Sequence, residues 1–480
     1  MPTISSPGIG SGLDVTSIVN QLDAANRAPV KLLTTRTTAL QAKLSAFGLL
    51  KSYTTNIHDT TAKLADPAFW QKTSASSSDS ASVSVASSTS AAVGSYSVEV
   101  QQLAQAQSLS SSAYADSTSA VGTGSLRIEL GSWNADKTAF TPATPPSQVD
   151  IPVPIGEDSL ESVRAKINAS NAGVSASIVK DSSGSRLVIR SNTTGAEHSV
   201  RITATADAPA APGGPTLDDL VYNPPSGAVK VTETALAKNA KATLNGVAIE
   251  SASNTLTEVT GGLSLTVSKV TTSAATVTVG LDTATMKSAI GDFVKAYNDL
   301  NRYVADQTKY DPDKKVAAAL QGDRSTLSLQ SQMRAAVLGN TGASTQFSRL
   351  SDMGIQIQPD GSLLVNDSKL SAAMSSNMPD VTKAFSKTDV VNPANNGFAV
   401  SLLKLTTALN NTDGLVTTHS QGLQANIDRN NKQVDVYNGR ADDMKVRLLA
   451  QYSALDVKLN SLTALNSYVA QQITTWNKSA

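Results

Sequence analysis

From Leu423 to Trp476 the sequence reads LQANIDRNNKQVDVYNGRADDMKVRLLAQYSALDVKLNSLTALNSYVAQQITTW. Its apolar residues recur at alternating spacings of three and four, which is the heptad pattern of a coiled-coil helix. Sustained over about seven heptads, the pattern predicts a rod roughly 80 Å long, because a helix rises 1.5 Å per residue. Asn430, Gln451 and Asn466 fall at or near core positions, where a polar side chain weakens pairing and helps to fix register. A helix of this length cannot be buried within one small domain.

The N-terminal end carries a matching pattern. From Leu13 to Leu64 the apolar residues fall at helical spacing. Asp14 is the expected N-cap, because its carboxylate can accept from the free amides of the first turn. Pro29 must kink or restart the helix, because proline has no amide hydrogen to donate. We therefore predict two collinear helices that end near Asp66-Pro67.

The two terminal helices each leave an apolar seam that needs a cover. Neither seam is rich enough in leucine and isoleucine to be stable alone, at roughly 1.5–3 kcal/mol for each large side chain buried. We therefore expect the two ends to pair and to become ordered on assembly. A solvated helical hairpin without a partner is the alternative.

The composition is typical of a modular protein without a charge-driven partner. The chain has 480 residues, and Lys plus Arg and Asp plus Glu both number 39. We therefore expect neither nucleic acid nor a membrane as a partner. The absence of cysteine excludes disulfides, thiolate metal sites and a cysteine nucleophile. Residues 1–12 lack the basic and apolar regions of a Sec signal peptide, so we expect a cytosolic protein or one exported without a cleaved signal.

Strand signals fill the middle of the chain. Alternating apolar residues predict strands at Tyr96–Val100 and Leu126–Leu130, and Asn245-Gly246 is the strongest hairpin signal. We interpret the proline-rich patch from Pro142 to Pro154 as a loop. Asp158 to Asn171 has the pattern of a short amphipathic helix.

The order of helix, strands and helices predicts an α+β multidomain protein. Its terminal helices form a coiled-coil leg and a helical domain, and two antiparallel β-rich domains are inserted between them. The predicted segments are 1–42 with 430–480 for the leg, 43–72 with 282–429 for the helical domain, 73–115 with 236–281 for an inner β domain, and 116–235 for an outer β-rich domain.

The sequence offers no arrangement that is typical of catalysis. His58, His198 and His419 are too scattered to place two on one metal ion. The run Gly8–Gly12 is not preceded by a strand or followed by a Walker lysine, so we interpret it as an entry into the first helix. Asp311-Pro312-Asp313 lacks the glycine and terminal glutamate of a calcium loop, as does Asp360-Gly361, and both are predicted turns. We expect no enzyme activity, no cofactor and no metal.

Several segments resemble one protein family, in order along nearly the whole chain. SPGIGSGLDVTSIVNQL (Ser6 to Leu22) and QAKLSAFGLLKS (Gln41 to Ser52) resemble the start of the bacterial flagellar filament-capping family, that of the second hook-associated protein. A central segment is similar to the Ile-Asn motif of flagellins and hook-associated proteins, here at Ile167-Asn168. LSDMGIQIQPDGSLLVNDSKL (Leu350 to Leu370) and YNGRADDMKVRLLAQYSALDVKLNSL (Tyr437 to Leu462) resemble the family's C-terminal region. The chain departs from the family at Asn26, where an acidic residue is common.

The resemblance implies a homo-oligomeric cap at the distal tip of the flagellar filament. Such a cap promotes flagellin folding and polymerisation and prevents the loss of unpolymerised flagellin. The implied partners are further copies of the chain, flagellin, the hook-filament junction proteins and a cytosolic export chaperone that holds the C-terminal helix. The implied location is outside the cell, reached through the flagellar type III system without signal cleavage.

We predict that the oligomer or flagellin interface lies on the terminal helices. The predicted residues are Leu22, Leu33, Leu40, Leu44, Ile427, Val434, Met444, Leu448, Leu455, Leu462, Val469 and Ile473. Two other functions remain open. One is a surface adhesin whose inserted domain near Gly122 to Val231 binds mucin or host glycans, and the other is a hook-filament junction protein.

Overall fold

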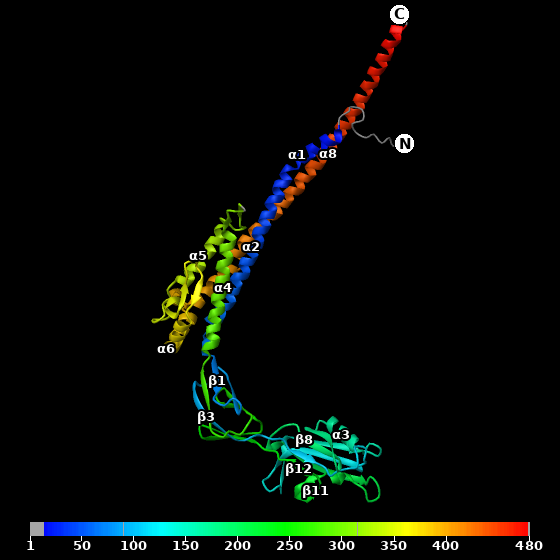
Figure 1. Ribbon diagram of the computed structural model, residues 1–480, viewed down its shortest axis with the longest axis vertical. Helices are drawn as coiled ribbons and strands as arrows, with labels where there is room; N and C mark the ends of the chain where they lie inside the picture. The colour runs from blue at the N-terminus through cyan, green and yellow to red at the C-terminus, as the bar shows by residue number, and fades with distance from the viewer. Residues whose placement is uncertain (1–13, 90, 314, 479–480) are drawn as a thin grey trace. The chain divides into compact units, whose positions relative to one another are not determined.

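The structure is a computed structural model that describes residues 14–478 except 90 and 314. It divides the chain into two compact units, Met1–Trp70 with Thr283–Ala480, and Gln71–Asp282. Figure 1 shows that the first unit is mainly helical and that the second is built from sheets. The first unit is therefore assembled from both ends of the chain.

Long helices make up the helical unit. The α-helices described in it are α1 (Val15–Asn26), α2 (Ala28–Ala65), α4 (Thr283–Thr308), α5 (Arg324–Leu338), α6 (Asp367–Ser386), α7 (Phe398–Asn410) and α8 (Leu415–Lys478). Two small hairpins join them, formed by β18 (Tyr310–Asp311) with β19 (Val316–Ala317) and by β20 (Ile355–Ile357) with β21 (Leu363–Val365).

The N-terminal helices begin and end where the sequence predicts. The backbone amide of Ser17 donates to Asp14 Oδ1 at 2.8 Å, so Asp14 caps α1. α1 ends at Asn26 and α2 begins at Ala28, with Pro29 in the first turn of α2, where its missing amide hydrogen costs no helical hydrogen bond. The restart predicted at Pro29 is confirmed.

α2 is the central helix of this unit, because it packs against α4, α7 and α8. Its buried face carries Phe47, Leu50, Ile57 and Leu64. Beyond its C-terminus, Trp70 donates through Nε1 to the Leu64 carbonyl at 2.9 Å, so the one polar atom of this buried indole is satisfied. This core anchors the base of the long α2–α8 pair.

The second unit consists of antiparallel sheets and one α-helix. The inner strands are β1 (Thr73–Ser77), β2 (Val83–Ser87), β3 (Gly94–Gln102), β13 (Ala240–Leu244), β14 (Val247–Ser251), β15 (Thr255–Thr260), β16 (Leu263–Val267) and β17 (Ala275–Leu281). The outer elements are β4 (Ser108–Ser110), β5 (Thr123–Trp133), β6 (Phe140–Val153), α3 (Leu160–Ala169), β7 (Val174–Asp181), β8 (Gly184–Ser191), β9 (Ser199–Ala208), β10 (Tyr222–Asn223), β11 (Ala228–Val229) and β12 (Thr232–Ala235).

These strands enclose two separate hydrophobic cores. One core is lined by inner strands and includes Val98, Leu265 and Val277, and the other lies between the outer sheets and α3 and includes Ile128 and Ile167. The inner sheets run β1-β17-β3-β13-β14 and β15-β16-β2, and the outer sheets run β11-β10-β9-β5-β6 and β12-β4-β8-β7. The predicted fold class, terminal helices with inserted antiparallel β-rich domains, is confirmed.

The prediction of a loop from Pro142 to Pro154 is wrong. Phe140–Val153 forms β6, which pairs with β5 and lies at the edge of its sheet. Proline is tolerated there because the free edge of a sheet needs no amide donor. Residues 143–146 fall in a register shift, since Ser147 pairs with Leu130 and Pro142 already pairs with Gly131. Most prolines therefore lie where no ladder hydrogen bond is lost.

Three asparagine side chains each imitate a strand partner by bonding both backbone groups of one residue. Asn168 on α3 accepts from the Ala176 amide at 2.7 Å and donates to its carbonyl at 2.9 Å. Asn254 pairs with Ala104 in the same way, and Asn298 on α4 pairs with Leu363. In the first case, the asparagine of the Ile-Asn motif attaches α3 to the free edge of β7. The motif therefore has a structural role in this chain.

Candidate assembly surface

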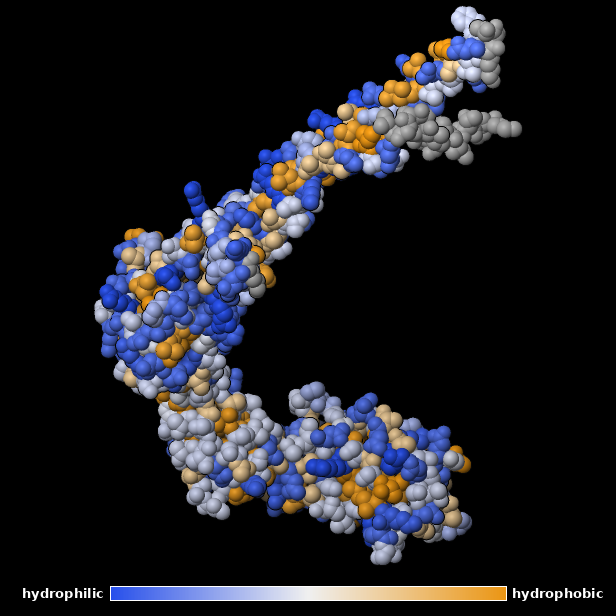
Figure 2. All heavy atoms as spheres, turned by 45° about the horizontal axis from the view of Figure 1, so that its top comes forward, coloured by the Kyte–Doolittle hydropathy of each residue, from blue (hydrophilic) through white to orange (hydrophobic). Residues whose placement is uncertain are grey.

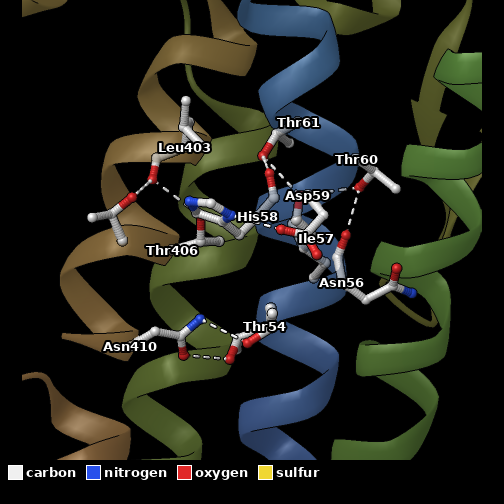
Figure 3. Close-up of polar contacts among 12 residues, drawn as sticks. Thr54, Asn56, Ile57, His58, Asp59, Thr60, Thr61, Leu403, Thr406 and Asn410 are labelled. Atoms are coloured by element: carbon white, nitrogen blue, oxygen red, sulfur yellow. Dashed lines mark hydrogen bonds and ion pairs between the residues drawn. The ribbon is translucent and has the colours of Figure 1, made fainter.

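The packing of α2 against α7 includes polar contacts that tie the two helices together. Thr54 Oγ1 donates to Asn410 Oδ1 at 2.7 Å, and the neighbouring Thr61 and Thr406 direct their hydroxyls to carbonyls of their own helices (Figure 3). His58 lies beside these contacts with Nδ1 3.0 Å from Asp59 Oδ1. The Asp59 side chain is exposed and that of His58 is half-buried, so the histidine is in contact with solvent at the helix surface.

The other sequence candidates for chemistry have structural roles. His419 packs on Phe47 with ring centroids 4.2 Å apart, and its Nε2 lies 3.3 Å from Asp323 Oδ2. Asp311 and Asp360 each accept a backbone amide two residues ahead, which is the geometry of the predicted turns. Within the described residues, no group of three His, Asp or Glu side chains is placed to hold a metal ion.

Among residues 14–478, leaving aside 90 and 314, no helix is both long and apolar enough to cross a bilayer. The glycine-rich run Gly8–Gly12 lies outside the described residues, so its predicted role as an entry to the first helix stays a prediction.

α2 and α8 run antiparallel in a register fixed at two distant points. Near one end Phe47 contacts His419. Near the other, Arg27 Nη1 donates to Asn438 Oδ1 at 2.9 Å. The number of residues between the two contacts is the same along α2 and along α8 to within one residue. The two helices therefore keep one register between these contacts.

A cluster of charged residues locks α8 to the junction of α1 and α2. Arg27 donates through Nε to Asp23 Oδ1 at 3.1 Å and forms an ion pair with Asp442, and Lys445 Nζ lies 3.6 Å from Asp23 Oδ2. The hydrogen bond to Asp442 raises the pKa of Arg27 above its usual value, ahead of the contribution of Asp23. The cluster is solvent-accessible, so it specifies register more than it stabilises the pair.

The paired region places half of the predicted interface residues inside the seam between the terminal helices. Ile427 is buried. Five others are half-buried, namely Leu33, Leu40, Leu44, Val434 and Leu448. The register places Leu40 opposite Ile427 and Leu33 opposite Val434. These residues therefore hold the chain's own ends together.

The other predicted residues face solvent. They are Leu22, Met444, Leu455, Leu462, Val469 and Ile473, with exposed fractions from 39% to 59%. The last three lie where α8 continues past α1 (Figure 1), and apolar side chains are visible along this arm in Figure 2. Leu465 and Tyr468, which the interface prediction did not include, are exposed beside them at 57% and 58%. The distal part of α8 is thus an apolar surface that the described chain leaves open.

Sequence reasoning missed several residues of the paired region. Val15 and Val19 are each 1% exposed and fasten α1 to the bundle. Thr37 and Asn430 are buried, and the α2–α8 register places them opposite each other. Among the described atoms, neither Thr37 Oγ1 nor Asn430 Nδ2 has a hydrogen-bond partner. The heptad pattern places Asn430 near a core position, but Thr37 lies on a helix from the other end of the chain, so the pattern does not reveal that the two residues oppose each other.

Family models match most of the chain. Residues 11–107 match the flagellar hook-associated protein 2 N-terminus, residues 237–464 match its C-terminus, and residues 136–193 match the flagellin hook IN motif. Flagellar hook-associated protein 2 of Salmonella typhimurium is 31% identical over 100% of both chains. The chain belongs to the flagellar hook-associated protein 2 family. The last match contains Ile167-Asn168, so the resemblance of that segment is confirmed as well.

Other members of the hook-associated protein 2 family support the same assignment. The protein of Escherichia coli K12 is 30% identical over 98% of each chain. The crystal structure of the flagellar cap protein FliD D1-D2-D3 domains from Escherichia coli superposes with a TM-score of 0.59 at 28% identity, covering 79% of this chain and 99% of that one. These relatives are structural proteins of the flagellum, in agreement with the expectation of a non-enzyme. The two models that match the terminal regions are those of hook-associated protein 2, and they give no support to a junction protein.

Proposed function

We propose that this chain caps the flagellar filament as a homo-oligomer at its distal tip, where it promotes the folding and polymerisation of flagellin and prevents its loss. The observation that carries the proposal is the open apolar surface of α8 beyond α1, in a chain that matches its family from end to end. A monomer gains nothing by exposing Leu462, Val469 and Ile473 to water. Burial of each would contribute roughly 1.5–3 kcal/mol to an assembly.

The proposed partners divide between the two sections of the leg. The paired section, α1 and α2 with α8, gives the leg its length and register. The open section supplies the surface that contacts other copies or flagellin. The hook-filament junction proteins are the first neighbours of the cap, before any flagellin is added. The proposed boundaries of leg, helical domain and two β domains are those expected from the sequence.

The seam is also suited to export. A chain without cysteine can pass through a narrow channel unfolded without reducing any disulfide. The buried polar pair Thr37 and Asn430 weakens the α2–α8 seam, because a buried group without a hydrogen bond costs about 1–3 kcal/mol. We propose that the type III system exports the chain without signal cleavage, and that a cytosolic chaperone covers the exposed C-terminal helix until then.

The test is complementation of a null strain. A strain that lacks the protein should secrete unpolymerised flagellin, and the full chain should restore filaments. Leu462→Asp with Ile473→Asp should fail to restore them, because two charges enter the apolar surface. Ser467→Asp with Gln471→Asp is the matched control, since it adds the same charge to the other face of the helix. Full filament growth with the first pair would contradict the proposal.

The same strains test the adhesin alternative. If the null strain grows normal filaments but no longer attaches to a mucin-coated surface, the inserted domain is the functional part and the cap proposal fails. Retained secretion of flagellin monomers in the null strain would support the cap.

A further inference from the structure

The hairpin of β20 and β21 turns two sets of backbone groups outward. The Asn366 amide donates to the Gly354 carbonyl at 2.8 Å, so these two residues are a directly bonded pair of the ladder. In an antiparallel ladder such pairs alternate with pairs whose amides and carbonyls point away from each other. The register therefore directs the backbone groups of Leu363 outward on β21 and those of Ile355 and Ile357 outward on β20.

One edge of this hairpin is closed and the other is open. On the β21 side, Asn298 of α4 donates to the Leu363 carbonyl at 2.9 Å and accepts from its amide at 2.7 Å, as Asn168 does for the edge of β7. On the β20 side, in the part of the chain that the structure describes, no hydrogen bond reaches the outward groups of Ile355 or Ile357. An unpaired strand edge is a template for a further strand.

The open edge borders a hollow of about 640 Å³ in the helical unit. β20 forms one wall, and the C-terminal end of α5 forms another. Leu338 in this second wall is 52% exposed. The apolar residues that line the hollow are Val337, Leu338, Leu350, Ile355, Ile357 and Leu363. The hollow therefore offers free backbone groups and apolar contacts side by side.

We propose that β20 binds an extended segment of flagellin that has not yet folded, as an added strand along this open edge. The proposal rests on the cap function proposed above and adds the surface that receives each subunit. The outward groups of Ile355 and Ile357 repeat every second residue, about 7 Å apart, which is the spacing that an extended chain can match. A helix has bonded its own backbone groups and cannot form this ladder.

Flagellin suits this edge better than a second copy of the chain. Strand addition takes its affinity from backbone hydrogen bonds and its specificity from pockets for alternate side chains. The strands of a folded copy are already paired within their own sheets, whereas an unfolded subunit still has its backbone groups free. β20 has three residues, so the added ladder is short. A ladder of two short strands is marginal in water, and flagellin can leave once it forms its own structure.

Hydrogen exchange of the full chain, resolved to single amides by fragmentation, tests the contact. Flagellin is diluted from denaturant into a solution of the chain. With flagellin present, the Ile355 and Ile357 amides should exchange at least about tenfold more slowly, because each gains a hydrogen-bond partner. The Gln356 amide lies in a directly bonded pair of the same strand and should change less.

Two leucines of α5 provide a matched pair of variants. Leu338 is 52% exposed at the hollow, and Leu327 is 48% exposed on the same helix but does not line the hollow. Leu338→Asp should weaken flagellin binding at least about tenfold, because a charge enters the apolar wall. Leu327→Asp adds the same charge and should leave binding unchanged. Both leucines are exposed, so neither change should unfold the helical unit.

Three results would overturn the proposal. Flagellin binding without slower exchange at Ile355 and Ile357, or with equal losses in the two variants, would refute strand addition and leave the cap function in place. Slow exchange of these amides in the assembled chain before flagellin is added would show that a second copy occupies the edge. A chain that binds no flagellin would refute the proposal as well. The cap function itself falls only if the null strain also retains normal filaments.

Discussion

Truncating one isoleucine in each section of α8 separates the two kinds of contact that the leg makes. Ile427 is 4% exposed against α2, and Ile473 is 53% exposed on the open surface. In the isolated monomer, Ile427→Ala should lower the free energy of opening the α2–α8 pair by about 2–5 kcal/mol, the range for buried isoleucine truncations that leave a cavity. Ile473→Ala should change it by less than about 0.5 kcal/mol, as for other exposed positions.

Hydrogen exchange measured by mass spectrometry is the suitable assay, because it reports the opening of α2 and α8 separately from the β unit. Peptides from α2 and from the paired part of α8 should exchange faster in Ile427→Ala, and peptides from the open part should be unchanged in both variants. In assembled protein, Ile473→Ala should weaken the oligomer. Equal protection losses in the two monomeric variants would show that the antiparallel seam is not closed as described.

Three further predictions concern other buried polar groups. Asn298→Ala should cost about 1–3 kcal/mol, because it leaves both backbone groups of Leu363 unpaired; faster exchange of the Leu363 amide is the readout. Thr37→Val with Asn430→Leu should raise the melting temperature of the helical unit in calorimetry, since two buried groups without hydrogen bonds are replaced by apolar ones. Burial raises the pKa of Tyr114 from 10.0 to about 12. The neutral phenol therefore stabilises the fold below pH 10, and this contribution is lost as the pH rises through about 12. Tyr114→Phe should remove the ionisation of this phenol near pH 12 from an ultraviolet titration.

Local sequence rules predicted the helix ends correctly because the interactions involved are local. Asp14 caps α1 through the amide of Ser17, three residues ahead, and Pro29 restarts the chain as α2. The fold class followed from the order of helical and alternating patterns. Each of these outcomes depends on residues within one or two turns of each other.

The error at Pro142–Pro154 has a different origin. Whether proline is compatible with a strand depends on which neighbours the strand has, and β6 has a partner on one side only. Position in a sheet is a property of tertiary structure. Composition alone therefore favoured a loop where the protein forms an edge strand.

Periodicity predicted the apolar residues that lie between α2 and α8. The contacts between the terminal helices are not apolar along their whole length. Arg27, Asp23, Asp442 and Lys445 replace apolar contacts with ion pairs where α1 meets α2. Asp23 and Arg27 are one turn apart, but Asp442 and Lys445 reach them from the other end of the chain, so no local pattern reveals the cluster. Once the antiparallel register is known, their charges are complementary.

Heptad periodicity cannot show where the cover of α8 ends, because Leu455, Leu459 and Leu462 continue the same stripe without interruption. In the part of the chain that the structure describes, the cover ends with α1 at Val15, and the side chains of residues 460–477 are exposed. The extent of this cover is therefore the reason to assign the lower section of α8 to folding and to propose the upper section for assembly.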